Sequence, residues 1–129
     1  MGDTFNMSGD FRGAILNIKS TLTNVQQSVG DIHSDDDGAK NELKQLIEQL
    51  NQSLQKAPPE TKEQVEAVAE TTKTLVDQAR EEKPNKTMIK INAEGLKQAA
   101  QNLAGVMPSV LPIVSQIVMS VMKMTGAGG

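Results

Sequence analysis

The 129-residue chain contains no cysteine, no tryptophan and no tyrosine, and its only aromatic residues are Phe5 and Phe11. Without cysteine the chain forms no disulfide and offers no thiolate to a metal ion, which favours a cytoplasmic protein. A core with so few rings must be built from Leu, Ile, Val, Ala and the seven methionines, and such side chains suit the packing of helix against helix. We therefore expect an all-α fold in a single helical domain, residues 1–129, which is large enough to bury a core.

Basic and aromatic residues are too sparse for a nucleic-acid-binding protein. The chain has 13 basic and 16 acidic residues, a formal net charge of -3 and a sequence pI near 5.1. No block of basic residues is available to neutralise phosphates, and almost no ring is available to stack on a base. We therefore expect no nucleic-acid partner.

No pattern in the sequence is typical of a catalytic, metal or cofactor site. The only histidine, His33, precedes an acidic stretch that ends at Gly38 and superficially resembles the start of a calcium loop. Counting Gly38 as the sixth loop position places Lys44 at the twelfth, where a bidentate glutamate is required. Ser34 is the direct neighbour of His33, which is too local for a catalytic triad. We therefore expect a non-enzymatic protein with no catalytic residues, no metal and no cofactor.

Apolar residues recur at steps of three and four in three segments, which predicts amphipathic helices near residues 12–30, 38–57 and 61–83. The second and third are separated by Pro58 and Pro59, which predicts a short turn and an antiparallel hairpin. The stripes that define the three helices are Ile15, Ile18, Leu22, Val25 and Val29; Leu43, Leu46, Ile47, Leu50 and Leu54; and Val65, Val68, Thr72, Leu75 or Val76, and Ala79.

The last third of the chain is less regular. In residues 86–91, Thr87, Ile89 and Ile91 alternate with Met88 and Lys90. This alternation fits a short strand paired with residues 4–7, but the segment could equally form the first turns of a helix. After Asn92, we expect a helix near 92–124 that Pro108 and Pro112 kink. The sequence thus predicts a four-helix bundle, or antiparallel helical hairpins, with a kinked and strongly apolar C-terminal helix.

Residues 103–122 contain no charged side chain, so a helix formed by them must be buried. It can lie in the chain's own bundle, between copies of the chain, or in lipid. Our leading hypothesis is a homo-oligomeric structural or scaffolding protein, open-ended in the manner of a filament, and the alternative is a membrane-active protein that inserts helix 103–122. The residues expected to mediate self-association are Phe5, Phe11, Val106, Val110, Ile113, Val114, Ile117, Val118, Val121 and Met122.

The two ends of the chain are rich in glycine. We expect residues 1–11 to form an extended N-terminal arm and residues 125–129 a flexible tail. Phe5 and Phe11 then have two alternative roles. They either close one end of the chain's own bundle or anchor the arm on a neighbouring subunit.

Three stretches, GDTFNMSGDFRGAILNIKSTLTNVQQSVG, the Pro-Pro hairpin and EKPNKTMIKINAEGLKQAAQNLAGVMPSVLPI, together cover nearly the whole chain. In these stretches the chain is similar to a group of small, poorly characterised bacterial helical proteins and modules. The resemblance implies a bacterial, modular, non-catalytic helical unit and assigns no active-site residue. It also implies an alternative function, an adaptor that presents the bundle to a larger protein of a bacterial signalling or defence system.

Overall fold

The computed structural model describes the backbone of residues 2–127 and the side chains of residues 11–127, and every regular element within this part of the chain is a helix. The all-α prediction is therefore confirmed. Five α-helices are present where the sequence predicted four. They are α1 (Gly2–Ser28), α2 (Asp37–Leu54), α3 (Lys62–Ala79), α4 (Lys86–Ala104) and α5 (Val110–Thr125), with 3-10 turns at Val29–Asp31 and Pro59–Thr61.

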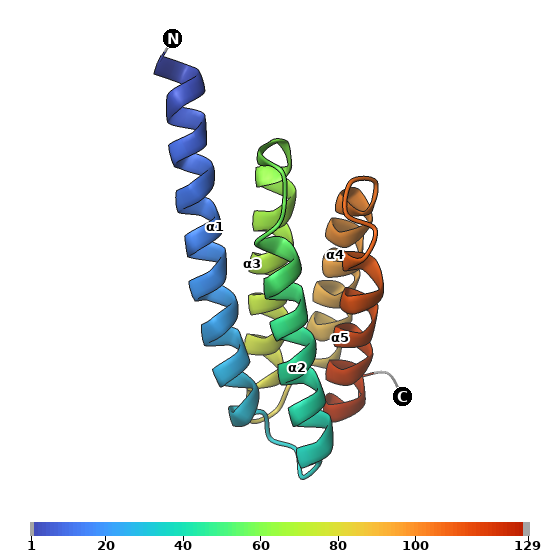
Figure 1. The fold of residues 1–129 in the computed structure, drawn as a ribbon. Coiled ribbons are helices and arrows are strands. Elements are labelled where there is room, and N and C mark those ends of the chain that lie inside the picture. The colour runs from blue at the N-terminus through green and yellow to red at the C-terminus, as the bar shows by residue number, and fades with distance from the viewer. Residues whose placement is uncertain (1, 128–129) are drawn as a thin grey trace.

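Successive helices run in opposite directions along a common axis and form an up-and-down bundle (Figure 1). The packing order around the bundle is α1, α2, α5, α4, α3 and back to α1. Consecutive helices are neighbours in this order, apart from α2 and α3. These two are antiparallel, as predicted, but α2 packs on α1 and α5 and α3 packs on α1 and α4, so they do not form the expected packed hairpin.

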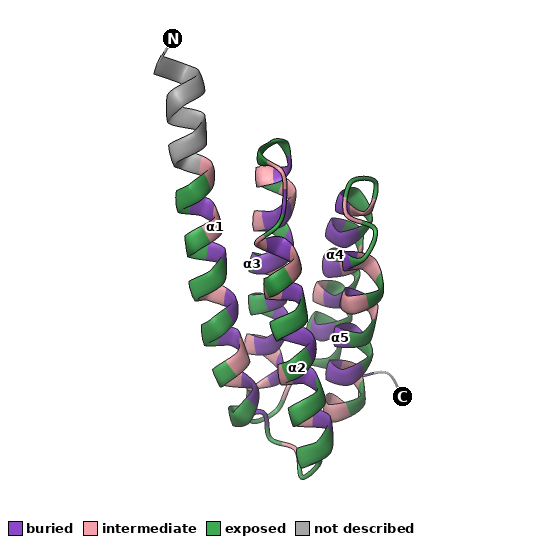
Figure 2. Cartoon of the chain, in the orientation of Figure 1, coloured by how far each residue is buried: buried purple, intermediate pink, exposed green. Residues whose placement is uncertain are grey.

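The core lies along the axis of the bundle, where each helix turns one apolar stripe inward (Figure 2). The stripes of α2 and α3 are buried as the spacing of their apolar residues predicted, and in α1 Ile18, Leu22 and Val25 are buried while Ile15 is half-buried. Alanines line α4 between its larger residues, with Ala93, Ala99 and Ala100 buried beside Ile89, Leu96 and Leu103. Small residues at these positions let the neighbouring helices approach closely.

Two helices begin at side-chain caps. The Asp36 carboxylate accepts a hydrogen bond from the Ala39 amide at 2.9 Å, and the Asn85 side-chain oxygen accepts one from the Met88 amide at 3.1 Å. Each cap satisfies one of the amide groups that the first turn of a helix leaves without a partner. The cap at Asn85 explains why residues 86–91 are helical.

We predict that Asp36→Ala and Asn85→Ala each lower the free energy of unfolding by about 1 kcal/mol, since each removes one cap. Urea denaturation followed by circular dichroism measures this loss. Asp35→Ala is the matched control because Asp35 is exposed and its side chain makes no capping bond. An equal loss in Asp35→Ala would show that charge in this loop, and not capping, stabilises α2.

The expected kinked helix over residues 92–124 is wrong. The chain instead forms two antiparallel helices, α4 and α5, joined by residues 105–109. Gly105, which follows the last residue of α4, has a low helix propensity and so favours the end of the helix. Pro108 restricts the residue before it to extended conformations. Pro112 lies in the first turn of α5, where its missing N–H costs no hydrogen bond, so it starts a helix without kinking one.

The strand pair is also wrong, and the residues expected to form an extended arm belong to α1. Residues 4–7 lie within α1 and residues 86–91 within α4, so neither segment is a strand, and α1 begins at Gly2. Asn92, after which the last helix was expected to begin, lies inside α4. Local alternation over six residues was outweighed by the Asn85 cap and by the burial of Ile89, which repeats at a helical spacing with Ala93 and Leu96.

The described part of the C-terminal tail, residues 125–127, packs against the bundle. Thr125 ends α5, Gly126 adopts a φ of 74° that favours glycine, and Ala127 is buried. A left-handed glycine followed by an apolar residue is a common way to end a helix. The tail predicted at residues 125–129 thus begins with the last residue of α5 and a buried alanine, and its last two residues lie outside the described part.

Candidate interaction surface

Half of the residues expected to mediate self-association lie in the chain's own core. Val110, Val114, Ile117, Val118 and Val121 are at most 1% exposed. They project from α5 toward the bundle axis, where they contribute to the common apolar core. They contact another molecule only if the bundle opens.

The remaining residues of that set are spread over the molecule. Ile113, Met122 and Phe11 are partly buried and pack against the core, and Val106 is exposed in the loop between α4 and α5. The contact of Phe11 with the core fits the role of closing the chain's own bundle. Phe5 lies outside the residues whose side chains are described.

None of the described helices is long and apolar enough to cross a lipid bilayer. The uncharged run from Leu103 to Met122 is divided between the end of α4, the loop and α5. With 16 residues, α5 is about 24 Å long, which is shorter than the roughly 30 Å hydrocarbon core.

The exposed apolar side chains gather on α4, α5 and their connection. Among residues 11–127, five large apolar side chains are exposed, and four of them belong to this hairpin. Met119 is the most exposed at 69%, and Leu16 of α1, at 65%, is the one that lies elsewhere. The other three are Met88, Ile91 and Val106.

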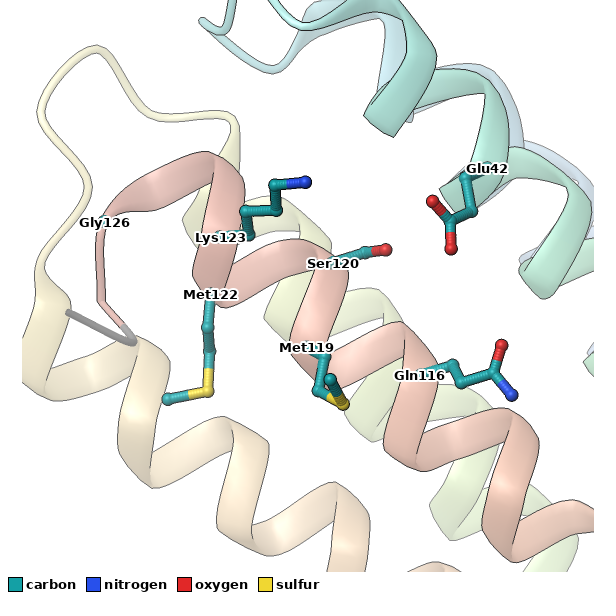
Figure 3. Close-up of a pocket in the computed structure, with 7 residues that line it drawn as sticks. All are labelled: Glu42, Gln116, Met119, Ser120, Met122, Lys123 and Gly126. Carbon is teal, nitrogen blue, oxygen red and sulfur yellow. The ribbon is translucent and has the colours of Figure 1, made fainter.

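A shallow groove of about 780 Å³ runs along the outer side of α5. Figure 3 shows its lining: Met119 and Lys123 project outward from α5, Met122 points toward α4, and Glu42 extends from α2 on the opposite side. Gln116, Ser120 and Gly126 complete the lining. Methionine side chains are flexible and polarisable, so they adapt to the shape of a partner.

Positive charge is concentrated on the same hairpin. Residues 86–127 carry four lysines and one glutamate, a net charge of +3, and the rest of the chain therefore carries -6 of the total of -3. Lys86, Lys90 and Lys97 are spaced by four and seven residues and share one side of α4. This side faces α5, since a Cβ placed on Gly126 would lie 3.7 Å from Cε of Lys86.

The lysine side of α4 and the outer side of α5 together form a surface that we call the hairpin face. Its residues are Lys86, Lys90, Lys97, Met119, Met122 and Lys123.

Negative charge follows one side of α3. Glu63, Glu66, Glu70, Lys73 and Asp77 recur at alternating spacings of three and four residues, which places them on one stripe, the α3 stripe, with a net charge of -3. Glu63 and Glu70 are exposed, and Glu66 and Asp77 are half-exposed. The small side chains of Ala67 and Thr74 are exposed on the same side of the helix.

Within residues 11–127, the only ion pair joins Lys73 to Asp77, at 2.9 Å. The hydrogen bond that Lys73 donates to Asp77 and the attraction of that carboxylate raise the pKa of Lys73 above its usual value of 10.5. The raised pKa extends the alkaline range over which Lys73 stays protonated, so the pair is lost at a higher pH than it would be with an ordinary lysine. The lysines of the hairpin face and the glutamates of the α3 stripe form no ion pair inside the described chain.

The described residues contain no cluster of three His, Cys, Asp or Glu side chains that could hold a metal ion. His33 and the aspartates that follow it lie in the exposed loop before α2, where Asp36 caps the helix. The surface with the most distinct chemistry is the hairpin face, which combines lysines and methionines, with Glu42 of α2 at the edge of its groove.

Comparison of the chain with protein-family models, with curated proteins and with solved structures finds no match. The similarity to bacterial helical modules noted above therefore stays an expectation. The bundle and its surfaces are the basis for a proposal about function.

The regular spacing of the lysines in α4 was a sequence signal for the hairpin face, but we did not include these lysines among the predicted site residues. We assigned the contact to the apolar run because its lack of charge was conspicuous, yet such a run is also what a buried helix requires. The spacing of Lys86, Lys90 and Lys97 was readable, but it defines a surface only once α4 is known to begin at Lys86. The exposure of Met119 depends on which side of α5 faces the core.

Proposed function

We propose that the chain is a non-catalytic scaffolding module that associates with copies of itself through the hairpin face. The observation that carries this proposal is that Met119, the most exposed of the large apolar side chains described, lies on the hairpin that carries the positive charge of an otherwise acidic chain. Interfaces are commonly organised around flexible or aromatic apolar anchors with charges at the rim, and methionine is enriched in them.

Relative to our first hypothesis, the proposed contact moves from the inner to the outer side of α5. The valines and Ile117 hold the bundle together, whereas Met119 and Lys123 are free to meet a second molecule. One helix then serves folding with one side and association with the other. This division explains why the most apolar helix of the chain retains exposed methionine and lysine.

We predict that Met119→Glu weakens self-association and leaves the fold intact. Removing an apolar anchor from the centre of an interface costs about 2 kcal/mol or more, which raises the dissociation constant roughly 30-fold. Size-exclusion chromatography with light scattering over a concentration series measures the association. A circular dichroism melt measures the fold.

Leu16→Glu is the matched control, because Leu16 is as exposed as Met119 but lies on α1. It should associate like the wild type. A wild-type chain that stays monomeric at millimolar concentration and low salt would contradict the proposed function. If Leu16→Glu abolishes association and Met119→Glu does not, the contact lies on α1.

A further inference from the structure

We infer that the hairpin face of one copy docks on the α3 stripe of the next, so that the module assembles head to tail. This inference rests on the proposed function and names the surface that the hairpin face binds. The two surfaces are opposite in charge, and the chain's own fold keeps them apart. They meet only between molecules.

The packing order of the helices separates the two surfaces. The lysines of α4 lie on its α5 side, whereas α3 packs on the opposite side of α4, where a Cβ placed on Gly95 would lie 3.6 Å from Cγ2 of Thr71. The α3 stripe and the hairpin face are thus two different patches on one chain. A contact between two different patches is heterologous, and repetition of it gives a ring or an open filament.

The two surfaces match in length and in shape. At a rise of about 1.5 Å per residue, Lys86 to Lys97 covers about 17 Å and Glu63 to Asp77 about 21 Å. The lysines can therefore lie along the three glutamates of an adjacent helix, with the Lys73–Asp77 pair at the end of the contact. Beside the carboxylates, the small exposed side chains of Ala67 and Thr74 leave a low surface that accommodates the exposed Met119. The contact therefore combines ion pairs with apolar packing.

A second copy fits the hairpin face better than an anionic lipid surface does. The lysines would attract either partner, but the remainder of the chain carries -6, and an anionic membrane repels it. A second copy uses both charges, since its α3 stripe supplies the carboxylates and its own hairpin face stays available for a third copy.

The test is a charge exchange between two double variants. In Lys90→Glu/Lys123→Glu the hairpin face becomes acidic, and in Glu66→Lys/Glu70→Lys the α3 stripe becomes basic. Each variant alone then brings like charges together, and we expect at least a tenfold loss of association in light scattering at about 50 mM salt. An equimolar mixture of the two variants restores opposite charges at every contact, and it should assemble again as an alternating polymer.

Arg12→Glu/Lys19→Glu is the control for Lys90→Glu/Lys123→Glu, since it lowers the net charge by the same amount on exposed positions of α1, and it should assemble like the wild type. If the wild type associates but Glu66→Lys/Glu70→Lys associates equally well, the α3 stripe is not the partner and this inference is overturned, while the proposed function stands. A mixture that stays monomeric also overturns it. So does a wild type that floats with phosphatidylserine vesicles but never self-associates, because the face then binds lipid.

Discussion

Ile117→Asp is expected to unfold the chain. Ile117 is fully buried in the centre of α5, so the variant loses the burial of a large aliphatic side chain, about 2–3 kcal/mol, and gains an unpaired carboxylate. Burying such a charge without a partner costs several kcal/mol more. The total approaches the 5–15 kcal/mol by which a domain of this size is typically stable.

Far-ultraviolet circular dichroism and a thermal melt measure this effect directly. Met119→Asp is the matched control, because the same substitution two residues away places the carboxylate on the outer side of α5. The control should keep its helicity and melt within a few degrees of the wild type. A folded Ile117→Asp chain with a wild-type melt would mean that α5 does not close the core, and it would also remove the basis for assigning association to the outer side of α5.

The apolar spacing alone predicted the core of the first three helices. Leu43, Leu46, Ile47, Leu50 and Leu54 were assigned to one stripe of a helix, and all five are buried. The prediction succeeded because a long repeat of steps of three and four fits no other regular structure. To predict the core, only the residues on the inward side of each helix have to be identified, and these are the apolar residues that the hydrophobic effect buries.

The sequence predicted less about the C-terminal third, because there local signals conflict. Residues 86–91 alternate like a strand, but the Asn85 cap and the tertiary packing of Ile89 favour a helix. Two prolines four residues apart, Pro108 and Pro112, were interpreted as kinks, whereas one lies in a loop and the other in a first turn. Only the position of each residue relative to a helix end distinguishes these roles.

The interaction surface was hardest to predict, since it depends on the packing order of all five helices. The lysines of α4 and the methionines of α5 are about 30 residues apart in the sequence and become one surface only because α4 and α5 are antiparallel neighbours. The α3 stripe is a regular acidic face by itself, which is typical of any solvated helix. Its separation from the hairpin face, and not its charge alone, favours a head-to-tail contact.

Ending the chain at Ala104, which removes α5, is expected to abolish cooperative folding. In the packing order α5 closes the bundle between α2 and α4, and it buries five aliphatic side chains almost completely: Val110, Val114, Ile117, Val118 and Val121. At about 1.5–3 kcal/mol for each, their loss removes roughly 7–15 kcal/mol, as much as a whole domain's stability. The inward stripes of α2 and α4 would then face water, and the truncated chain should aggregate or stay largely unfolded.

Circular dichroism and urea denaturation of the truncated chain measure this outcome, with Gln116→Ala/Lys123→Ala in the full chain as the control. That control alters two exposed residues on the outer side of α5 and should unfold with an unchanged midpoint. A synthetic peptide of residues 106–127 added to the truncated chain should restore part of the helicity, because it supplies the apolar side chains that pack on α2 and α4. Cooperative unfolding of the truncated chain near the wild-type midpoint would show that α1 to α4 form a complete core, and that α5 is free to leave the bundle and bind another molecule with its apolar side.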